Sequence, residues 1–130
     1  MNREKTICII EDDINYMMLT QKMIEFTALF KEILTFRNGK QAYDGLLAWK
    51  ERNGGFPDFI LLDINMPIWD AWDFLEEFSK QADGWNGVIY IITSSIDKVD
   101  ESRSLEFPLV KGYLKKPVGF DKIIELFQLG

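Results

Sequence analysis

The chain has 130 residues, 47% hydrophobic and 28% charged, so it is long enough and apolar enough to bury the core of one domain. Its formal net charge of −6 disfavours direct binding to nucleic acid, which requires a basic surface. It contains no histidine and a single cysteine, Cys8, which excludes histidine catalysis, histidine metal ligands and an internal disulfide.

Targeting signals are not evident in the sequence. No apolar run approaches the roughly 20 residues that cross a bilayer, and the polar start lacks the features of a secretory leader. A single thiol inside an apolar run is typical of a reducing compartment. We therefore expect a cytoplasmic protein with no membrane insertion.

Five short apolar runs recur along the chain. Three of them are continuous rather than alternating, as expected when both faces of a parallel sheet are covered. The predicted strands are Thr6–Ile10, Ile33–Phe36, Phe59–Asp63, Val88–Thr93 and Gly112–Lys115.

Helical spacing separates these runs, and we interpret each apolar stripe as facing the core. The stripes comprise Tyr16, Leu19, Met23 and Phe26; Ala42, Leu46 and Trp49; Trp72, Leu75 and Phe78; and Phe120, Ile123, Ile124 and Phe127. The segment Asp97–Leu105 is a weaker helix candidate because its apolar pattern is thin. Alternating strands and helices predict an α/β fold, a doubly wound five-stranded parallel sheet of the (βα)5 type, which binds ligands beyond the carboxyl ends of its strands.

Polar residues follow four of the predicted strands. They are Glu11, Asp12 and Asp13; Asp63 and Asn65; Thr93, Ser94 and Ser95; and Lys115 and Lys116. In a parallel sheet these groups share one edge. Neighbouring carboxylates raise one another's pKa values, and Mg²⁺, which prefers oxygen ligands, relieves that conflict. A carboxylate can also accept a phosphoryl group as a nucleophile, with a metal and an ammonium group neutralising its charge.

Together these motifs resemble the receiver domain of bacterial response regulators, the CheY-like domain of two-component signalling. The motifs are Glu11-Asp12 after the first strand, Asp63 in LLDINMP, Thr93 in IITSS and Lys116-Pro117 in GYLKKP. The resemblance extends from Lys5 to about Gln128. It implies the flavodoxin-like strand order 2-1-3-4-5, and a phosphoacceptor domain that assists its own phosphorylation and dephosphorylation rather than an enzyme.

The resemblance also implies a role for each site residue. Asp63 would accept the phosphoryl group, Lys116 would pair with it, and Thr93 and Tyr113 would form a switch. The expected ligands of Mg²⁺, the one cofactor implied, are Asp12, Glu11 through water, Asp63 and the backbone carbonyl of Asn65. The Lys116–Pro117 bond would be cis. Ser95 and Asn65 occupy positions that tune dephosphorylation in the family, whereas Asp13 can be explained as an acid at a helix start.

A phosphoryl donor must come from a partner, since the chain has no histidine. The resemblance implies a histidine kinase or phosphotransfer protein that docks near the first helix and the site loops. The face of the fourth helix, fifth strand and fifth helix would then act on an unknown protein target, and it is a candidate homodimer interface. We interpret residues 1–130 as a single receiver domain without an output domain, because no helix-turn-helix segment or basic tail follows; a fragment of a longer regulator is the alternative.

Three other classes of protein are alternatives to this interpretation. A phosphohydrolase with an aspartyl nucleophile carries a second acid where this chain has Asn65, and a flavodoxin carries a phosphate loop where this chain has three acids. A pseudo-receiver scaffold that works without phosphorylation is a third alternative.

The turn that commonly reads Asp-Gly in the family reads Asp70-Ala71 here, so we expect its conformation to differ. Trp69 and Trp72 flank this turn and either pack on the helices or face a partner.

Overall fold

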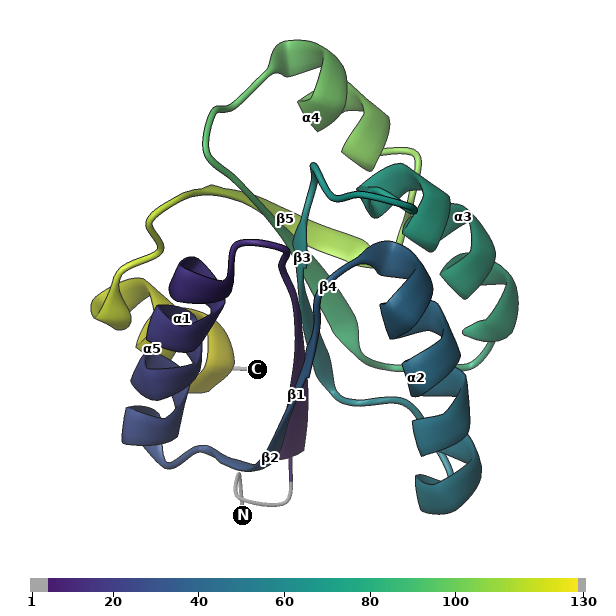
Figure 1. Cartoon of the computed structure of the whole chain (residues 1–130), viewed down its shortest axis with the longest axis horizontal. Coiled ribbons are helices and arrows are strands. Elements are labelled where there is room, and N and C mark those ends of the chain that lie inside the picture. The colour runs from purple at the N-terminus through teal and green to yellow at the C-terminus, as the bar shows by residue number, and fades with distance from the viewer. Residues whose placement is uncertain (1–4, 129–130) are drawn as a thin grey trace.

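The computed structural model of the protein describes residues 5–128 and consists of one parallel sheet with helices on both faces (Figure 1). The strands pair in the order β2-β1-β3-β4-β5, which confirms the predicted fold class and strand order. The elements are β1 (Lys5–Ile10), α1 (Ile14–Thr27), β2 (Phe30–Phe36), α2 (Gly39–Asn53), β3 (Phe59–Asp63), α3 (Ala71–Gln81), β4 (Val88–Thr93), α4 (Lys98–Ser104), β5 (Val110–Lys115) and α5 (Phe120–Gln128).

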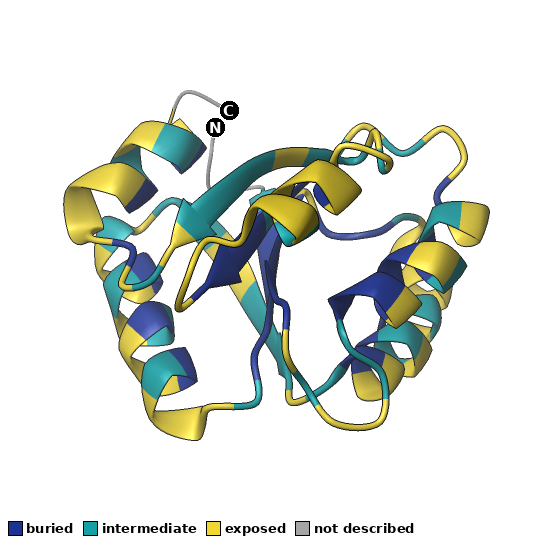
Figure 2. Ribbon diagram, turned by 90° about the horizontal axis from the view of Figure 1, so that it is seen from above, coloured by how far each residue is buried: buried dark blue, intermediate teal, exposed yellow. Residues whose placement is uncertain are grey.

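Two apolar cores lie on opposite faces of this sheet. Helices α1 and α5 cover one face, and α2 and α3 cover the other (Figure 1). All five residues of β3 are buried because successive side chains point to opposite faces: Ile60 and Leu62 join the core under α2 and α3, while Phe59 and Leu61 join the core under α1 and α5. Figure 2 shows these buried strands at the centre and exposed residues on the outer sides of the helices.

The central strands β3 and β4 have the predicted bounds, whereas the others begin earlier than predicted. β2 begins at Phe30 instead of Ile33, β5 at Val110 instead of Gly112, and β1 at Lys5. β2 and β5 are the edges of the sheet, and their first residues are mostly half-buried or exposed. Polar side chains are tolerated there, so the apolar signal is shorter than the strand.

The predicted apolar stripe of α1 is wrong in part. Leu19 and Phe26 are 52% and 81% exposed, while Met17, Thr20 and Ile24 are the buried residues of this helix. The start of α1 is apolar on several sides, so spacing alone could not identify its inner face. Predictions for α2 and α3 are confirmed, since their stripes are buried.

The outer end of α5 also departs from its prediction. Phe120 is 37% exposed and packs edge-on against the exposed ring of Phe26, with ring centroids 5.8 Å apart. Ile123 and Phe127 are buried as predicted. The weaker helix candidate forms α4, in which the Asp97 side chain accepts hydrogen bonds from the first backbone N–H groups. Among residues 5–128, no helix is both long enough and apolar enough to span a bilayer.

The turn before α3 holds Asp70-Ala71, the pair at which we expected a departure from the family pattern. Ala71 is the first residue of α3, capped by Asp70, and it does not adopt a positive φ. The left-handed residue is Ile68, with φ of 68°, a conformation that costs a β-branched side chain about 1–2 kcal/mol. Trp72 is buried and packs on the core. Trp69 is half-buried and packs against Tyr43, with the two ring centroids 5.4 Å apart.

Phe78 is fully buried on α3 beside the rings of Phe56 and Phe74. We predict that Phe78→Ala lowers the free energy of unfolding by about 3–5 kcal/mol, because it leaves a cavity. Phe26→Ala, on an 81% exposed ring, should lower it by about 0.5 kcal/mol. Urea unfolding followed by circular dichroism measures both; equal losses would contradict the packing described here.

Candidate functional site

The carboxyl ends of the parallel strands meet at one edge of the sheet and bring the predicted site residues together. Glu11 and Asp12 follow β1, Asp63 is the last residue of β3, and Thr93 is the last residue of β4. Lys116 follows β5, and its backbone N–H donates to the carbonyl of Thr93 at 2.7 Å. The Lys116–Pro117 peptide bond is cis, as predicted.

Three carboxylates form the acidic part of this site. One oxygen each from Glu11, Asp12 and Asp63 lies within 4.8 Å of the others. Glu11 is completely buried and Asp63 is 6% exposed, whereas Asp12 is half-buried. We call these three residues the acid cluster. Bringing like charges together out of water is unfavourable unless cations compensate them.

Lys116 supplies a positive charge inside the cluster. Its Nζ lies 2.8 Å from Oε1 of Glu11 and 3.2 Å from Oδ1 of Asp63. The other carboxylate oxygen of Glu11 accepts a hydrogen bond from the backbone N–H of Asp13 at 3.1 Å. One oxygen of Glu11 therefore forms an ion pair and the other accepts a hydrogen bond, while Asp12 remains open to solvent on one side.

The surroundings of Asp63 and Lys116 shift the pKa values of both groups. Burial, reinforced by the charges of Glu11 and Asp12 and opposed by Lys116, raises the pKa of Asp63 from 3.8 to about 7. Burial alone would lower the pKa of Lys116, but its contacts with Glu11 and Asp63 outweigh burial and raise it. Lys116 therefore stays charged, and Asp63 becomes a strong nucleophile only when more positive charge compensates it.

The donor set fits Mg²⁺. Carboxylate oxygens are the ligands that this ion prefers, and one oxygen from each member of the acid cluster lies within 4.8 Å of the others. Asp12, half-buried, and Asp63 could bind the ion directly. Glu11, whose two oxygens already have partners, could contribute through a water molecule.

The hydroxyl of Thr93 is directed to the loop that follows β4. It donates to the carbonyl of Ser95 at 3.0 Å and accepts from the backbone N–H of the same residue at 3.4 Å. Tyr113 on β5 is half-buried, and burial, followed by the charge of Asp100, raises the pKa of its hydroxyl. The predicted switch pair thus lies between the sheet edge and the start of α4.

The remaining predicted residues lie around the site. Asn65 and Ser95 are exposed in the loops after β3 and β4, at the mouth of the site. The side chain of Asp13 accepts a hydrogen bond from the backbone N–H of Tyr16 at 3.1 Å and caps α1. This agrees with the interpretation of Asp13 as an acid at a helix start.

Two residues near the site were not predicted to belong to it. The Lys116 Nζ lies 4.7 Å from the ring centroid of Tyr16, and the guanidinium of Arg37 donates to the backbone carbonyl of Asp12 at 3.1 Å. Both contacts join residues far apart in sequence, so spacing could not reveal them. The signal that was available for Tyr16 is its place on the first turn of the helix that begins beside the acid pair.

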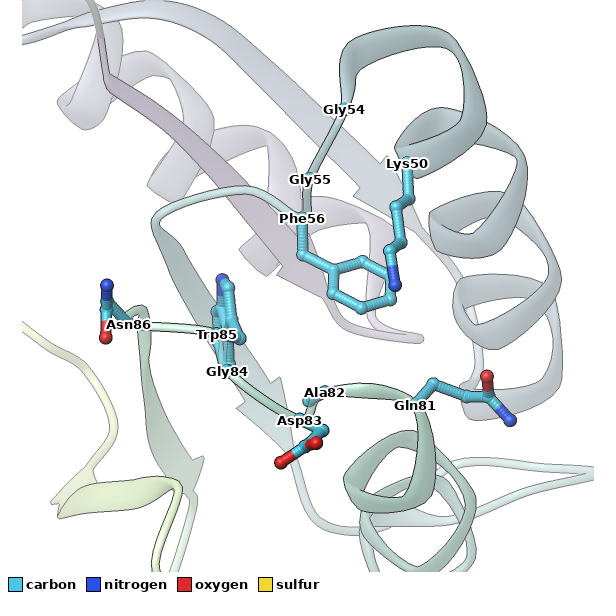
Figure 3. A pocket seen from close by; sticks show the side chains of 10 residues that line it. All are labelled: Lys50, Gly54, Gly55, Phe56, Gln81, Ala82, Asp83, Gly84, Trp85 and Asn86. Carbon is cyan, nitrogen blue, oxygen red and sulfur yellow. The ribbon is translucent and has the colours of Figure 1, made fainter.

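A separate cavity lies at the opposite edge of the sheet and contains none of the predicted site residues. It has a volume of about 240 Å³ and lies between the segments that lead into β3 and β4, with Phe56, Trp85 and Lys50 in its wall (Figure 3). It does not enter the chemistry of the acid cluster.

Comparison with known proteins agrees with the geometry of the site. The family model described as the response regulator receiver domain matches residues 7–128. The chain belongs to the response regulator receiver domain family. Response regulator Rcp1 of Synechocystis sp. is 27% identical over 128 residues, covering 98% of this chain and 86% of that protein.

Solved structures show the same receiver fold. A two-component response regulator from Cytophaga hutchinsonii matches with a TM-score of 0.84 and 24% identity over 96% of this chain and 95% of that one. The phosphorylated cyanobacterial phytochrome response regulator RcpA matches with a TM-score of 0.75 and 27% identity over 97% and 88%. The predicted family is thereby confirmed. Receiver domains are regulatory, bind Mg²⁺ at an acidic site and interact with histidine kinases and downstream targets.

The raised pKa of Asp63 predicts how the stability of the metal-free receiver domain depends on pH. The pKa of Asp63 is about 7 in the folded protein and 3.8 for an ordinary aspartate. Between these two pH values the folded state holds a proton on Asp63 that the unfolded state releases. Stability therefore falls as the pH rises through this window. Asp63→Asn removes the effect. The free energy of unfolding of this variant, relative to that of the parent, should therefore rise by about 2–4 kcal/mol between pH 4 and pH 8.

Urea unfolding in EDTA across this pH range measures the difference. Asp83→Asn, a change at an exposed aspartate, is the matched control and should follow the parent at every pH. A difference between Asp63→Asn and the parent that does not change with pH would show that Asp63 carries no such penalty.

Proposed function

We propose that this receiver domain accepts a phosphoryl group on Asp63 in a Mg²⁺-dependent reaction, from a partner histidine kinase or phosphotransfer protein. The observation that supports this most strongly is the buried carboxylate of Asp63, 3.2 Å from Lys116 Nζ and clustered with Glu11 and Asp12. Its role is regulatory: the phosphoryl group changes a protein-binding face of the cytoplasmic domain.

Asp63 is the nucleophile in this proposal. One of its oxygens attacks phosphorus, the phosphorus–nitrogen bond of the donor's phosphohistidine breaks, and the released imidazole takes up a proton. The reaction needs positioning and charge compensation more than covalent assistance. Lys116 already lies within ion-pair distance of Asp63 Oδ1 and compensates the charge on the transferred group.

The acid cluster would hold the metal ion. Asp12 and Asp63 would bind it directly, Glu11 would act through water, and the backbone carbonyl of Asn65 would complete the protein ligands. When bound, Mg²⁺ neutralises charge on the phosphoryl oxygens and favours the ionised form of Asp63. Asp12, the half-buried member of the cluster, leaves the site accessible to the ion.

The switch follows from the charge that the phosphoryl group adds, about −2 at neutral pH. Thr93, whose hydroxyl now contacts Ser95, turns to donate to a phosphoryl oxygen. The space that it leaves beside β5 is taken by Tyr113, which moves away from Asp97 and Asp100 at the start of α4. Such a change is a shift between two packings that a local charge biases.

The surface that responds is the face of α4, β5 and α5. It exposes apolar side chains around α4, with Ile96, Val99 and Leu105 being 50%, 75% and 82% exposed. A downstream protein target, or a second copy of the receiver domain, would bind there. Net negative charge disfavours nucleic acid as the direct target.

Intact mass spectrometry tests the proposal. After incubation with Mg²⁺ and acetyl phosphate, the parent should gain about 80 Da, the mass of one phosphoryl group, and EDTA should prevent the gain. Asp63→Asn should gain nothing, because an amide is not a nucleophile towards phosphorus.

Asp83→Asn is the matched control and should be phosphorylated like the parent, since Asp83 is exposed and outside the acid cluster. An equal gain in Asp63→Asn would place the phosphoryl group on another residue. The absence of a gain in the parent, with acetyl phosphate and with a histidine kinase, would favour the pseudo-receiver scaffold.

A further inference from the structure

Tyr16 makes two contacts with the segment that carries Lys116. The ring lies under the ammonium group, with Lys116 Nζ 4.7 Å from the ring centroid. The hydroxyl accepts a hydrogen bond from the backbone N–H of Val118 at 3.1 Å. One side chain of α1 therefore contacts both the charged end of Lys116 and the backbone two residues beyond it.

Lys116 needs such contacts because its ammonium lies at the end of four flexible methylene groups. Two of its neighbours, Glu11 and Asp63, are carboxylates that attract Nζ and do not by themselves fix its position between them. The aromatic face adds a third, uncharged contact that favours a cation and shields it from water. The Lys116 side chain is only 16% exposed. Cation–π attraction is stronger for such a desolvated cation than for one at the surface.

Tyr16 is itself held in place by the acidic side of the site. Its backbone N–H donates to the side chain of Asp13, which caps α1 directly after Asp12. The neighbouring Met17 is buried in the core under α1. The start of α1 therefore fixes the Tyr16 ring relative to Glu11 and Asp12, and the face of this ring contacts Lys116.

We propose that Tyr16 is a positioning residue for Lys116, and that its ring face keeps Nζ in place for phosphoryl transfer to Asp63. The inference rests on the proposed phosphorylation of Asp63. Tyr16 acts on the reaction through Lys116, and its ring also packs against the core under α1 and α5. Its hydroxyl anchors the backbone at Val118 and contributes mainly to stability.

The test is the initial rate of phosphorylation by acetyl phosphate below saturation, measured by intact mass. Tyr16→Leu should slow the reaction about threefold to tenfold, because it removes the ring face. Tyr16→Phe retains the ring and should stay within about twofold of the parent. Phe26→Leu is the matched control, an aromatic-to-leucine change on the exposed side of the same helix, and should leave the rate unchanged.

Lys116→Met separates positioning from a structural role. In this background Tyr16→Leu should cause no further loss, because residues that act as a unit are not additive. An equal slowing by Tyr16→Leu with and without Lys116 would overturn the proposal. So would an unchanged rate in Tyr16→Leu, or a loss in Tyr16→Phe as large as that in Tyr16→Leu. Circular dichroism checks the fold of each variant, and Tyr16→Met replaces Tyr16→Leu if leucine unfolds the protein.

The outcomes also distinguish this inference from the proposed function. If the parent gains no phosphoryl group, phosphorylation of Asp63 has failed before Tyr16 is tested. If the parent is phosphorylated and Tyr16→Leu matches Phe26→Leu, phosphorylation stands and the role of Tyr16 is rejected.

Discussion

The ion pairs of Lys116 with Glu11 and Asp63 are the interaction on which the rest of the site depends. Three carboxylates converge at one edge of the sheet, two of them buried, and Lys116 offers them one positive charge. Burial raises the pKa of Asp63 to about 7, reinforced by the charge of Glu11, because one ammonium group does not neutralise three carboxylates. The metal-free site therefore favours the binding of an added cation. Burial of these carboxylates lowers the stability of the fold, and the same burial makes the site suited to binding a cation.

The fold creates this imbalance through its parallel sheet. Continuous apolar strands such as β3 are covered on both faces, so the residue that ends β3 remains in a largely dry environment. Asp63 is that residue, and Glu11 holds the equivalent place after β1. The backbone N–H of Lys116 donates to the carbonyl of Thr93, so the chain after β5 brings the cation to the same edge. Helix α4 follows β4 after a single loop, so it lies one loop away from Thr93 at this edge.

Much of this arrangement was predictable from sequence, for definable reasons. Strands β3 and β4 were predicted residue for residue because burial on both faces makes them continuous apolar runs, and their terminal residues located the site. The edge strands β2 and β5 were predicted too short because solvent tolerates their polar ends. The stripe of α1 was partly wrong, since consecutive apolar residues gave no single inner face. Tyr16 does pack against the core under α1 and α5, as interpreted, but its contact with Lys116 depends on a helix rotation that spacing could not supply.

The central claim is that the acid cluster is a divalent cation site, and the free energy of unfolding as a function of Mg²⁺ concentration tests it most directly. Binding to the folded state alone should stabilise the parent by about 1.4 kcal/mol for each tenfold rise in Mg²⁺ above the dissociation constant. Asp12→Asn should lose this response, and NaCl of equal ionic strength should not reproduce it. A parent that Mg²⁺ does not stabilise, or an Asp12→Asn variant that responds equally, would contradict the account.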